Sequence, residues 1–401
     1  MSLVPDFLQK LQSGKKELLQ NERPSEAQRS ERLLAWTDAL RESIPDLYRL
    51  DPAACFFSRD YYETAWAVQA IATIERTVKA MTAPSEASPR RASGLHAVVL
   101  SVHTPLPSLF ETLSASLAAG NSILVRAWPA QAALLEKLQS LLVGTGFSPG
   151  SLQFVADGEN ETLPLFLGHP GVRLVSVLGT DDASEKALAQ VPWMEKKWQI
   201  FRSGKTSAIV LADADLDMAA DGIIRAALEG QGTLSWNVSR VIVVDSIEAE
   251  FKAVLKNKLA SISSQLTDSS QKKKNAILQS LTSEQARELH EGSPLTVLEN
   301  VSNCSEYHQL ELQSPLLFLI PIKYAFDAAK WVNNLPNALC LQMWGSDEKI
   351  DKLLPKLETS QVFRRTWVGA LEVWNQGIKS GFAGTPDPRW DGGFYSDRTN
   401  F

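Results

Sequence analysis

The chain has 401 residues, of which 44% are hydrophobic and 21% are charged, and its formal net charge is -6. This length exceeds one ordinary compact core and indicates two domains or one large α/β unit. The negative charge argues against binding to nucleic acid or to an anionic membrane, because both favour a basic surface. No apolar run is long enough for a transmembrane helix, and the charged N-terminal residues lead us to expect no signal peptide.

The three cysteines, Cys55, Cys304 and Cys340, are scattered along the chain. Such an odd and sparse set indicates neither a disulfide framework nor a metal site, so we expect no metal and a cytoplasmic or otherwise reducing location. The one dense basic run, Lys272–Lys274, follows a polar stretch. We interpret it as a solvated helix start or loop.

The N-terminal part, residues 1–82, has the pattern of helices. Apolar residues recur at helical spacing over Glu26–Leu40 and again over Tyr61–Met81, which predicts two of them. The Ser- and Pro-rich stretch from Thr82 to Ser93 ends this pattern.

Short apolar segments then alternate with amphipathic segments. The segments predict strands at 96–102, 121–126, 152–156 and 172–178, and helices at 109–119 and 130–143. Alternation of this kind is typical of a parallel sheet covered by helices on both faces.

A second α/β series begins near Lys205. Strands are predicted at 207–211, 241–244 and 315–321, and a helix at 218–228 that the acidic segment Asp213–Asp217 can cap. Two successive α/β units therefore account for the length of the chain.

Several blocks of the sequence resemble, in the same order, the motifs of the aldehyde dehydrogenase family. They are LAAGNSILVR at 117–126, FSPGSLQFV at 147–155, HPGVRLVSVLGT at 169–180, GKTSAIVLADADLD at 204–217, GQGTLSWNVSRV at 230–241, ELQSPLL at 311–317 and KSGF at 379–382. The resemblance implies two Rossmann-like parallel-sheet α/β domains preceded by N-terminal helices. Residues 1–204 would form the helices and the cofactor-binding-type domain, and 205–368 the catalytic-type domain. Residues 369–401 would return to the first domain or to an oligomer interface.

The same resemblance assigns the catalytic positions, and two of them have changed. Ser235 occupies the position of the nucleophilic cysteine, and a serine hydroxyl is a far weaker acid than a thiol and needs an adjacent base. Phe201 occupies the position of the general-base glutamate and cannot carry a proton. His103 aligns with the asparagine that stabilises the oxyanion, and a neutral histidine can donate one such hydrogen bond.

The positions that hold NAD(P) in this family have also changed, so the resemblance makes binding of this cofactor possible but doubtful. Arg126 and Pro129 stand where a lysine and a glutamate would hold the adenine ribose. Gly179 and Thr180 would precede the phosphate-binding helix, whose first turn here contains Asp181 and Asp182, with Ser184 in place of a glycine. Glu311 retains the family's second ribose contact or is an exposed acid before a strand.

Three functions remain open. The first is a scaffold, regulatory or binding subunit without aldehyde-oxidising activity, which forms a homodimer or pairs with an active aldehyde dehydrogenase. The second is an NAD(P)-dependent oxidoreductase with atypical residues, and the third is a hydrolase that uses Ser235 and His103. Three tryptophans are candidates for a contact surface or a filled pocket, and core filling is the favoured interpretation for each: Trp193, Trp198 and Trp236.

Overall fold

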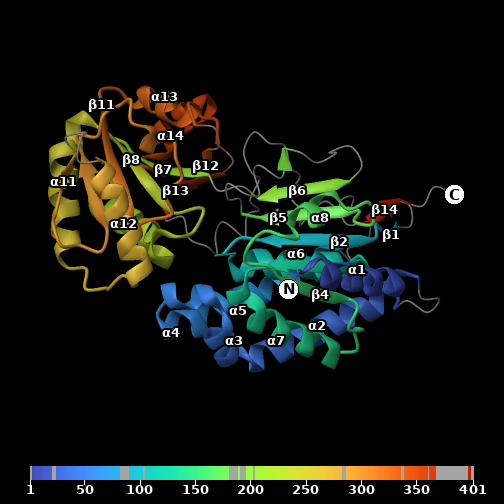
Figure 1. Ribbon diagram of the computed structural model, residues 1–401. Helices are drawn as coiled ribbons and strands as arrows, with labels where there is room; N and C mark the ends of the chain where they lie inside the picture. The colour runs from blue at the N-terminus through green and yellow to red at the C-terminus, as the bar shows by residue number, and fades with distance from the viewer. Residues whose placement is uncertain are drawn as a thin grey trace. The chain divides into compact units, whose positions relative to one another are not determined.

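The computed structural model describes residues 2–19, 24–81, 90–102, 104–179, 188–189, 196–201, 204–281, 286–335, 338–359, 361–366 and 396–398. Its contacts divide the chain into two compact units (Figure 1). The first unit comprises residues 1–54, 58–202 and 385–401, and the second comprises 55–57 and 203–384. No helix in the described ranges combines the length and the apolar character that crossing a membrane requires.

The first unit begins with helices, as predicted. They are α1 (Val4–Leu18), α2 (Glu26–Glu42), α3 (Ile44–Leu50), α4 (Arg59–Tyr61), a π-helical turn (Tyr62–Trp66) and α5 (Ala67–Met81). A capping box begins α2, because Ser25 accepts a hydrogen bond from the Gln28 backbone and the Gln28 side chain accepts one from Ser25. The 3₁₀ turn Pro52–Phe56 separates α3 from α4.

A five-stranded parallel sheet forms the centre of the first unit, in the order β4-β3-β2-β5-β6. Its strands are β2 (Leu95–Leu100), β3 (Ser122–Ala127), β4 (Leu152–Ala156), β5 (Leu174–Leu178) and β6 (Lys197–Phe201). Its helices are α6 (Leu106–Ala118), α7 (Ala132–Gly144) and α8 (Leu163–Gly168). A separate antiparallel pair joins β1 (Arg90–Ala92) to β14 (Ser396–Arg398). The parallel order confirms the predicted fold class for this unit.

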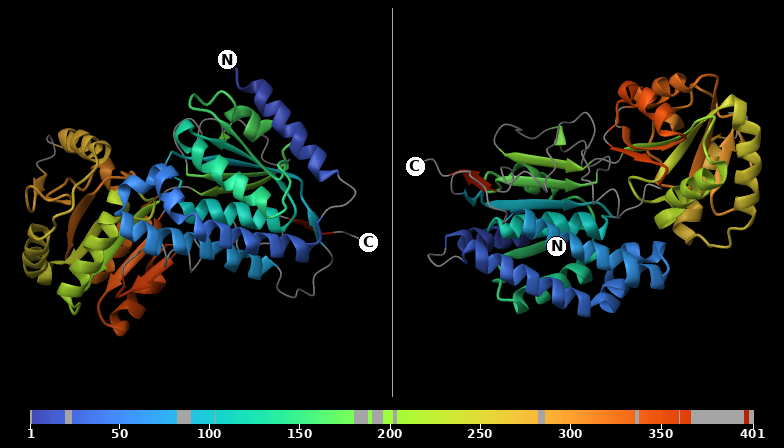
Figure 2. Two further views of the ribbon diagram at one scale, coloured as in Figure 1. Left: turned by 90° about the horizontal axis from the view of Figure 1, so that it is seen from below. Right: turned by 180° about the vertical axis from the view of Figure 1, so that it is seen from behind.

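Helices cover both faces of this sheet (Figure 2). On one face Phe7 and Leu11 of α1 pack with Ala97 of β2 and with Phe166 of α8. On the other face α6 and α7 contact the strands, and α2 and α5 pack outside α6. Because residues alternate along β2, His96 points to the α6 face and hydrogen-bonds there to Ser116.

The second unit contains a seven-stranded sheet in the order β13-β12-β7-β8-β11-β10-β9. All neighbours are parallel except the pair β9 and β10. The strands are β7 (Lys205–Val210), β8 (Val238–Val244), β9 (Arg287–Glu288), β10 (Thr296–Glu299), β11 (Leu316–Ile322), β12 (Ala338–Trp344) and β13 (Gln361–Arg364). The helices are α10 (Leu216–Leu228), α11 (Asp245–Ala260), α12 (Asp268–Leu281), α13 (Ala328–Asn333) and α14 (Asp347–Leu353).

Two layers of helices bury this second sheet as well. Val332 of α13 and Ile350 of α14 pack against Ile209 and Leu341, which lie on one face of the strands. Helix α10 lies on the opposite face, where Gly222 lies against the ring of Trp344. The predicted cap of α10 is confirmed, because Asp215 accepts a hydrogen bond of 3.0 Å from the Met218 backbone.

Candidate functional site

The strand order of the first unit places a topological switch point between β2 and β5, since their connections leave in opposite directions. Ligands of doubly wound sheets bind beyond the carboxyl ends of the strands at such a point. Here Gly179 follows β5 with a φ of +85°, and a Cβ on it would lie 2.7 Å from the Ser101 hydroxyl after β2. The close approach of the two strand ends therefore requires glycine at this position.

Arg126 lies near the carboxyl end of β3 and is 1% exposed. Its Nη2 donates to the Asp157 carbonyl at 2.7 Å and to Oδ1 of Asn160 at 2.5 Å, and its Nη1 donates to the Leu100 carbonyl at 3.5 Å. Nε lies 3.8 Å from the Asp157 carboxylate. The guanidinium also stacks on Trp128, 4.6 Å from the ring centre. Arg126 is thus directed at groups of its own domain.

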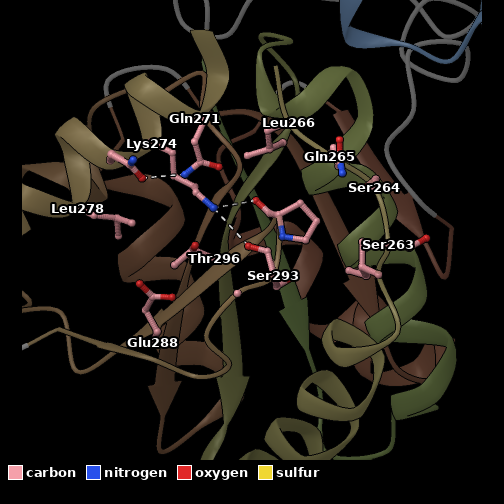
Figure 3. Close-up of a pocket in the computed structure, with 14 residues that line it drawn as sticks. Ser263, Ser264, Gln265, Leu266, Gln271, Lys274, Leu278, Glu288, Ser293 and Thr296 are labelled. Atoms are coloured by element: carbon pink, nitrogen blue, oxygen red, sulfur yellow. Dashed lines mark hydrogen bonds between the residues drawn. The ribbon is translucent and has the colours of Figure 1, made fainter. Parts of the chain in front are cut away.

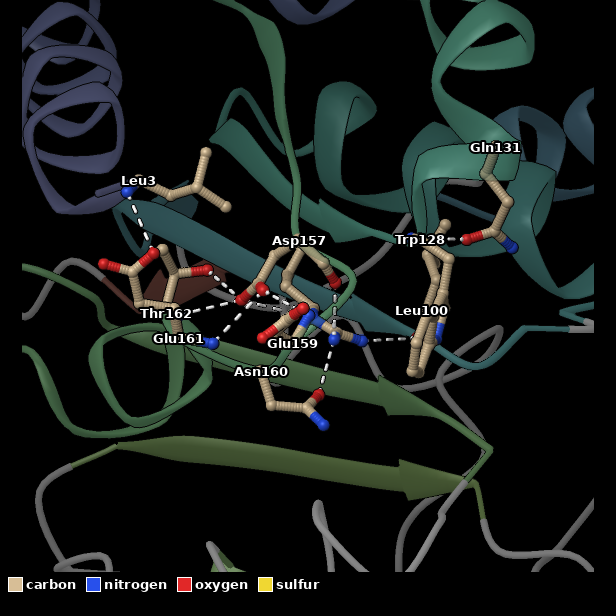
Figure 4. Close-up of polar contacts among 10 residues, drawn as sticks. Leu3, Leu100, Trp128, Gln131, Asp157, Glu159, Asn160, Glu161 and Thr162 are labelled. Atoms are coloured by element: carbon tan, nitrogen blue, oxygen red, sulfur yellow. Dashed lines mark hydrogen bonds and ion pairs between the residues drawn. The ribbon is translucent and has the colours of Figure 1, made fainter. Parts of the chain in front are cut away.

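Asp157 organises the loop that follows β4 (Figure 4). Its carboxylate, fully buried, accepts hydrogen bonds from the backbone of Glu159, Glu161 and Thr162 and from the Thr162 hydroxyl. Burial alone raises the pKa of this carboxyl, but the hydrogen bonds from Thr162 and Glu159 and the charge of Arg126 outweigh it and leave the pKa lowered. The Asp157 carboxylate is therefore ionised and forms a buried ion pair with Arg126.

Of the remaining predicted residues of the first unit, the structure describes Phe201 and Pro129. Phe201 ends β6 half-buried, and its carbonyl accepts the Gly179 N–H at 2.9 Å. His103, Thr180, Asp181, Asp182, Ser184 and Trp193 lie outside the described residues, as does the KSGF block. Pro129 begins a 3₁₀ turn whose Gln131 side chain accepts from the Trp128 backbone and donates to the Ser101 carbonyl.

Ser235 lies in the loop that precedes β8. The side chain of Asn237 stabilises this loop through hydrogen bonds. Oδ1 of Asn237 accepts from the Leu234 backbone at 2.7 Å, and its Nδ2 donates to the carbonyls of Ala226 and Glu229 at 2.7 and 3.0 Å. The Ser235 side chain is half-buried and has no hydrogen-bond partner in the described part of the chain. Its neighbour Trp236 is 1% exposed, which agrees with the core-filling interpretation.

The Ser235 loop packs against the segment that leads into β11. Gly230, Gln231 and Gly232 all have positive φ angles, of 57°, 55° and 73°. A Cβ on Gly232 would lie 2.5 Å from the Pro315 nitrogen. This contact brings the loop of Ser235 beside the segment that begins at Glu311, so the structure places these two predicted positions in one region of the second unit.

Glu311 is not the exposed acid considered as one alternative. It is half-buried; its Oε1 accepts the Gln313 N–H at 3.2 Å, and its Oε2 has no partner in the described residues. Burial raises the pKa of Glu311 to about 7, although the positive charges of Lys205 and Lys273 act in the opposite direction. Among the predicted site residues of the second unit that the structure describes, Glu311 alone has a shifted pKa.

Two buried cations that the sequence analysis did not select, Lys205 and Arg240, form a cluster with the neutral His308, and the charge of Lys205 acts on Glu311. Lys205, the first residue of β7, is 2% exposed and donates to the carbonyls of Tyr307 and Leu310 at 3.0 and 2.6 Å. Burial lowers the pKa of Lys205 to about 8 and that of Arg240 to about 9, and it lowers the pKa of His308 to about 4. A lysine and an arginine inside otherwise apolar strand segments were the available signal for this cluster.

Arg240 is fixed as firmly as Arg126. Its Nη2 donates to Ser207 at 2.7 Å and to the Trp331 carbonyl at 3.1 Å, and its Nη1 donates to the His308 carbonyl at 3.0 Å. The His308 ring packs edge-on against Trp331, with 5.0 Å between the ring centres. Arg240 therefore links β7, the segment before β11 and helix α13 through hydrogen bonds.

Of the three cysteines, burial excludes Cys340 as an alternative nucleophile, whereas Cys55 and Cys304 are exposed. Cys340 is buried in β12, where burial raises the pKa of its thiol, and Cys304 is exposed in a loop before the Glu311 segment. Among the described residues, no group of acidic, histidine and cysteine side chains is arranged to hold a metal ion.

Comparison with known proteins places these features in a family. The family model "Aldehyde dehydrogenase family" matches residues 22–399. Human 2-aminomuconic semialdehyde dehydrogenase is 24% identical over 317 residues, which cover 72% of this chain and 65% of the human protein. Malonate-semialdehyde dehydrogenase 1 of Oceanobacillus iheyensis is 29% identical over 136 residues, which cover 34% of this chain and 28% of that protein. The match thus spans less than two thirds of each relative.

Solved structures show the same fold. An oxidoreductase from Marinobacter aquaeolei superposes with a TM-score of 0.86 at 17% identity, over 98% of this chain and 89% of that one. An NAD+ complex of aldehyde dehydrogenase from Bacillus cereus superposes with a TM-score of 0.84 at 16% identity, over 98% and 87% of the two chains.

Proposed function

The chain belongs to the aldehyde dehydrogenase family, and within that family we propose that it is a member without aldehyde-oxidising activity, acting as a scaffold, regulatory or binding subunit. The observation that carries this proposal is the commitment of Arg126 to Asp157, Asn160 and Leu100. In active relatives the residue at this position would donate to the adenine ribose. A guanidinium already paired inside its own domain has to break these bonds before it can bind a nucleotide.

The residues at the ribose position do not fit NAD(P). Arg126 lies under Trp128 and against the loop after β4, with 1% of its surface exposed. Pro129, at the position of the acceptor glutamate, has no side-chain oxygen to accept a ribose hydroxyl. We therefore assign no chemical step to this cofactor.

The catalytic positions support the same proposal. The Ser235 hydroxyl makes no hydrogen bond to a base among the described residues, and Phe201 has no titratable group. Covalent attack on a carbonyl needs both an activated nucleophile and a group that accepts a proton.

One observation favours the alternative of an atypical NAD(P)-dependent oxidoreductase. Glu311 keeps a buried carboxyl oxygen, Oε2, without a hydrogen-bond partner among the described residues, and a carboxyl oxygen is a group that accepts a hydrogen bond from a sugar hydroxyl. The two relatives named above are both dehydrogenases of semialdehydes. This alternative predicts measurable nucleotide affinity in spite of the engaged Arg126.

The two functions separate in one binding experiment. The purified full chain is titrated with NAD+ and NADP+ by isothermal titration calorimetry, and then assayed for NADH or NADPH formation with a panel of semialdehydes. We expect no saturable binding in the micromolar range and no reduction of the nucleotide. Micromolar affinity together with nucleotide reduction would overturn the proposal. Ester hydrolysis that disappears in Ser235→Ala would instead establish the hydrolase.

The proposed role also predicts a partner. We expect the chain to form a homodimer or to associate with an active aldehyde dehydrogenase. Size-exclusion chromatography with light scattering tests the first arrangement. Mixing with the active enzyme encoded by the same organism, followed by the same measurement and an activity assay, tests the second. A chain that is monomeric alone and in every mixture contradicts the scaffold role.

A further inference from the structure

A cavity in the second unit lies outside the positions described above. It has a volume of about 600 Å³ and is enclosed by three segments (Figure 3). These are the loop after α11 at 262–266, one side of α12, and the turn between β9 and β10 at 292–296. The exposed residues Ser263, Ser264 and Gln265 stand at its rim, so the cavity opens to solvent.

Lys274 is the buried cation of this cavity, which corrects the interpretation of the basic run as solvated. It lies inside α12 with 6% of its surface exposed, whereas Lys272 is exposed. Its ammonium donates to the carbonyls of Ser293 and Pro294, both at 3.3 Å (Figure 3). It makes no ion pair within the described residues. A buried ammonium with two long hydrogen bonds has one donor left and no counter-charge in contact.

Ser293 provides a second unsatisfied group at the same place. It is 6% exposed, and its hydroxyl has no hydrogen-bond partner among the described residues. Buried hydroxyls in folded proteins nearly always have a partner, so an orphan in a cavity wall indicates a missing one. The hydroxyl and the Lys274 ammonium therefore both favour an acceptor oxygen that enters the cavity.

The opposite charge in the lining is an acid. Of the 14 residues that line the cavity, Lys274 and Glu288 are charged. Glu288 is exposed, and its charge acts on Lys274, partly opposing the lowering of the Lys274 pKa by burial. The Gln271 and Asn275 amides are hydrogen-bonded to each other at 2.8 Å, and three aliphatic side chains complete the wall: Ile262, Leu266 and Leu278.

We propose that this cavity binds a small amino acid or a similar zwitterion. The carboxylate would bind Lys274 and Ser293, the amine would face Glu288, and a short aliphatic part would contact Ile262, Leu266 and Leu278. A dianion such as phosphate fits less well, because Glu288 would repel its second charge. This inference is independent of whether the chain binds NAD(P), since every lining residue lies in residues 262–296.

The test uses the full chain and defined probes. Isothermal titration calorimetry with 4-aminobutyrate and L-leucine is compared with butyrate, which lacks the amine, and with butylamine, which lacks the carboxylate. We expect at least one amino acid to bind more tightly than butyrate, and butylamine not to bind. No binding by either amino acid at millimolar concentration, or equal binding of butyrate and 4-aminobutyrate, would overturn the proposal.

Variants connect the binding to the cavity. Lys274→Met is expected to weaken binding about tenfold or more, because one charge-assisted hydrogen bond is lost. Lys272→Met, on the same helix but exposed and outside the lining, serves as the matched control and leaves the affinity unchanged. Glu288→Gln removes the preference for the amino acid over butyrate. Unchanged binding in Lys274→Met contradicts the assignment. Should that variant fail to fold, Ser264→Trp at the exposed rim blocks entry, and unchanged binding there contradicts it equally.

Discussion

Asp157→Asn is the substitution that best tests whether Arg126 is held inside its own domain. The carboxylate accepts four hydrogen bonds and is the counter-charge of a guanidinium that is 1% exposed. The asparagine amide keeps the shape but places a donor against backbone N–H groups and leaves Arg126 buried without an opposite charge. Breaking a buried ion pair on one side costs about 3–5 kcal/mol, against a typical stability of roughly 5–15 kcal/mol.

The assay is urea unfolding followed by far-UV circular dichroism. With an m-value of about 1–3 kcal/mol/M, we expect the urea midpoint of the first unit to fall by at least roughly 1 M. Asp38→Asn is the control, because the Asp38 side chain is 76% exposed and its ion pair with Arg41 lies on the surface. Exposed pairs contribute about 0.5 kcal/mol or less. Equal midpoints for the two variants would refute the argument.

The pH dependence of the same variant provides an independent check. The pKa of Asp157 is lowered in the folded state, so its contribution is present above the unfolded pKa of about 3.9. It is lost as the pH falls through the lower folded value. The stability difference between the wild type and Asp157→Asn should therefore be largest near neutral pH and shrink in acid. A difference that stays constant down to acidic pH would show that packing, not charge, is responsible.

Three further outcomes follow from the geometry. Gly232→Ala should destabilise the second unit by at least about 2 kcal/mol, because the added Cβ would lie 2.5 Å from the Pro315 backbone. The control Gly292→Ala, at a similar φ of +82° but with open space around it, should cost about 1 kcal/mol. Equal losses of the two variants in urea unfolding would contradict the clash. Burial lowers the pKa of His96 to about 3, so between that pH and about 6.5 only the unfolded chain binds the proton. The free energy of unfolding should therefore fall by about 1.4 kcal/mol for each pH unit below about 6.5. His96→Gln should lack this pH-dependent loss when denaturation is measured at several pH values, and the same dependence of stability on pH in both proteins would refute the argument. Ser235→Cys alone should produce no NADH from aldehydes in a spectrophotometric assay, and turnover by that variant would contradict the loss of the other catalytic groups.

The sequence predicts the local elements of this fold well where a short apolar segment is bounded by glycine. The strand expected at 152–156 is observed as Leu152–Ala156, and the expected cap of α10 is made by Asp215. Strand β6, with the sequence KWQIF, was not predicted. There Gln199 is buried and accepts a hydrogen bond from Ser176 on the neighbouring strand, so its burial depends on a contact that is distant in sequence.

The candidate site was harder to predict, because the state of a polar side chain depends on its partners and not on its own type. The resemblance identified Arg126 as a donor, but Asp157 and Asn160, which occupy its N–H groups, lie 31 and 34 residues further along the chain. The burial of Lys274 likewise depends on the turn at Ser293 and Pro294. A run of three lysines shows a helix with a polar side, but not which lysine faces a cavity.

The buried polar groups of this protein differ in whether they have hydrogen-bond partners within the described residues. Arg126 and Arg240 are buried cations whose Nη groups donate to acceptors of the same unit, so both hold their own unit together. Glu311 and Ser293 each keep an oxygen without a partner in the described residues, and the Lys274 ammonium has no counter-charge in contact with it there. A buried polar group without a partner has lost its hydrogen bonds to water and has gained none in the folded protein, which costs free energy. A ligand would recover that free energy at Glu311 and in the Lys274 cavity, whereas at Arg126 it would first have to displace the bonds to Asp157 and Asn160. If the chain binds small molecules, the physical argument therefore directs the search to the second unit and away from the ribose position of the first.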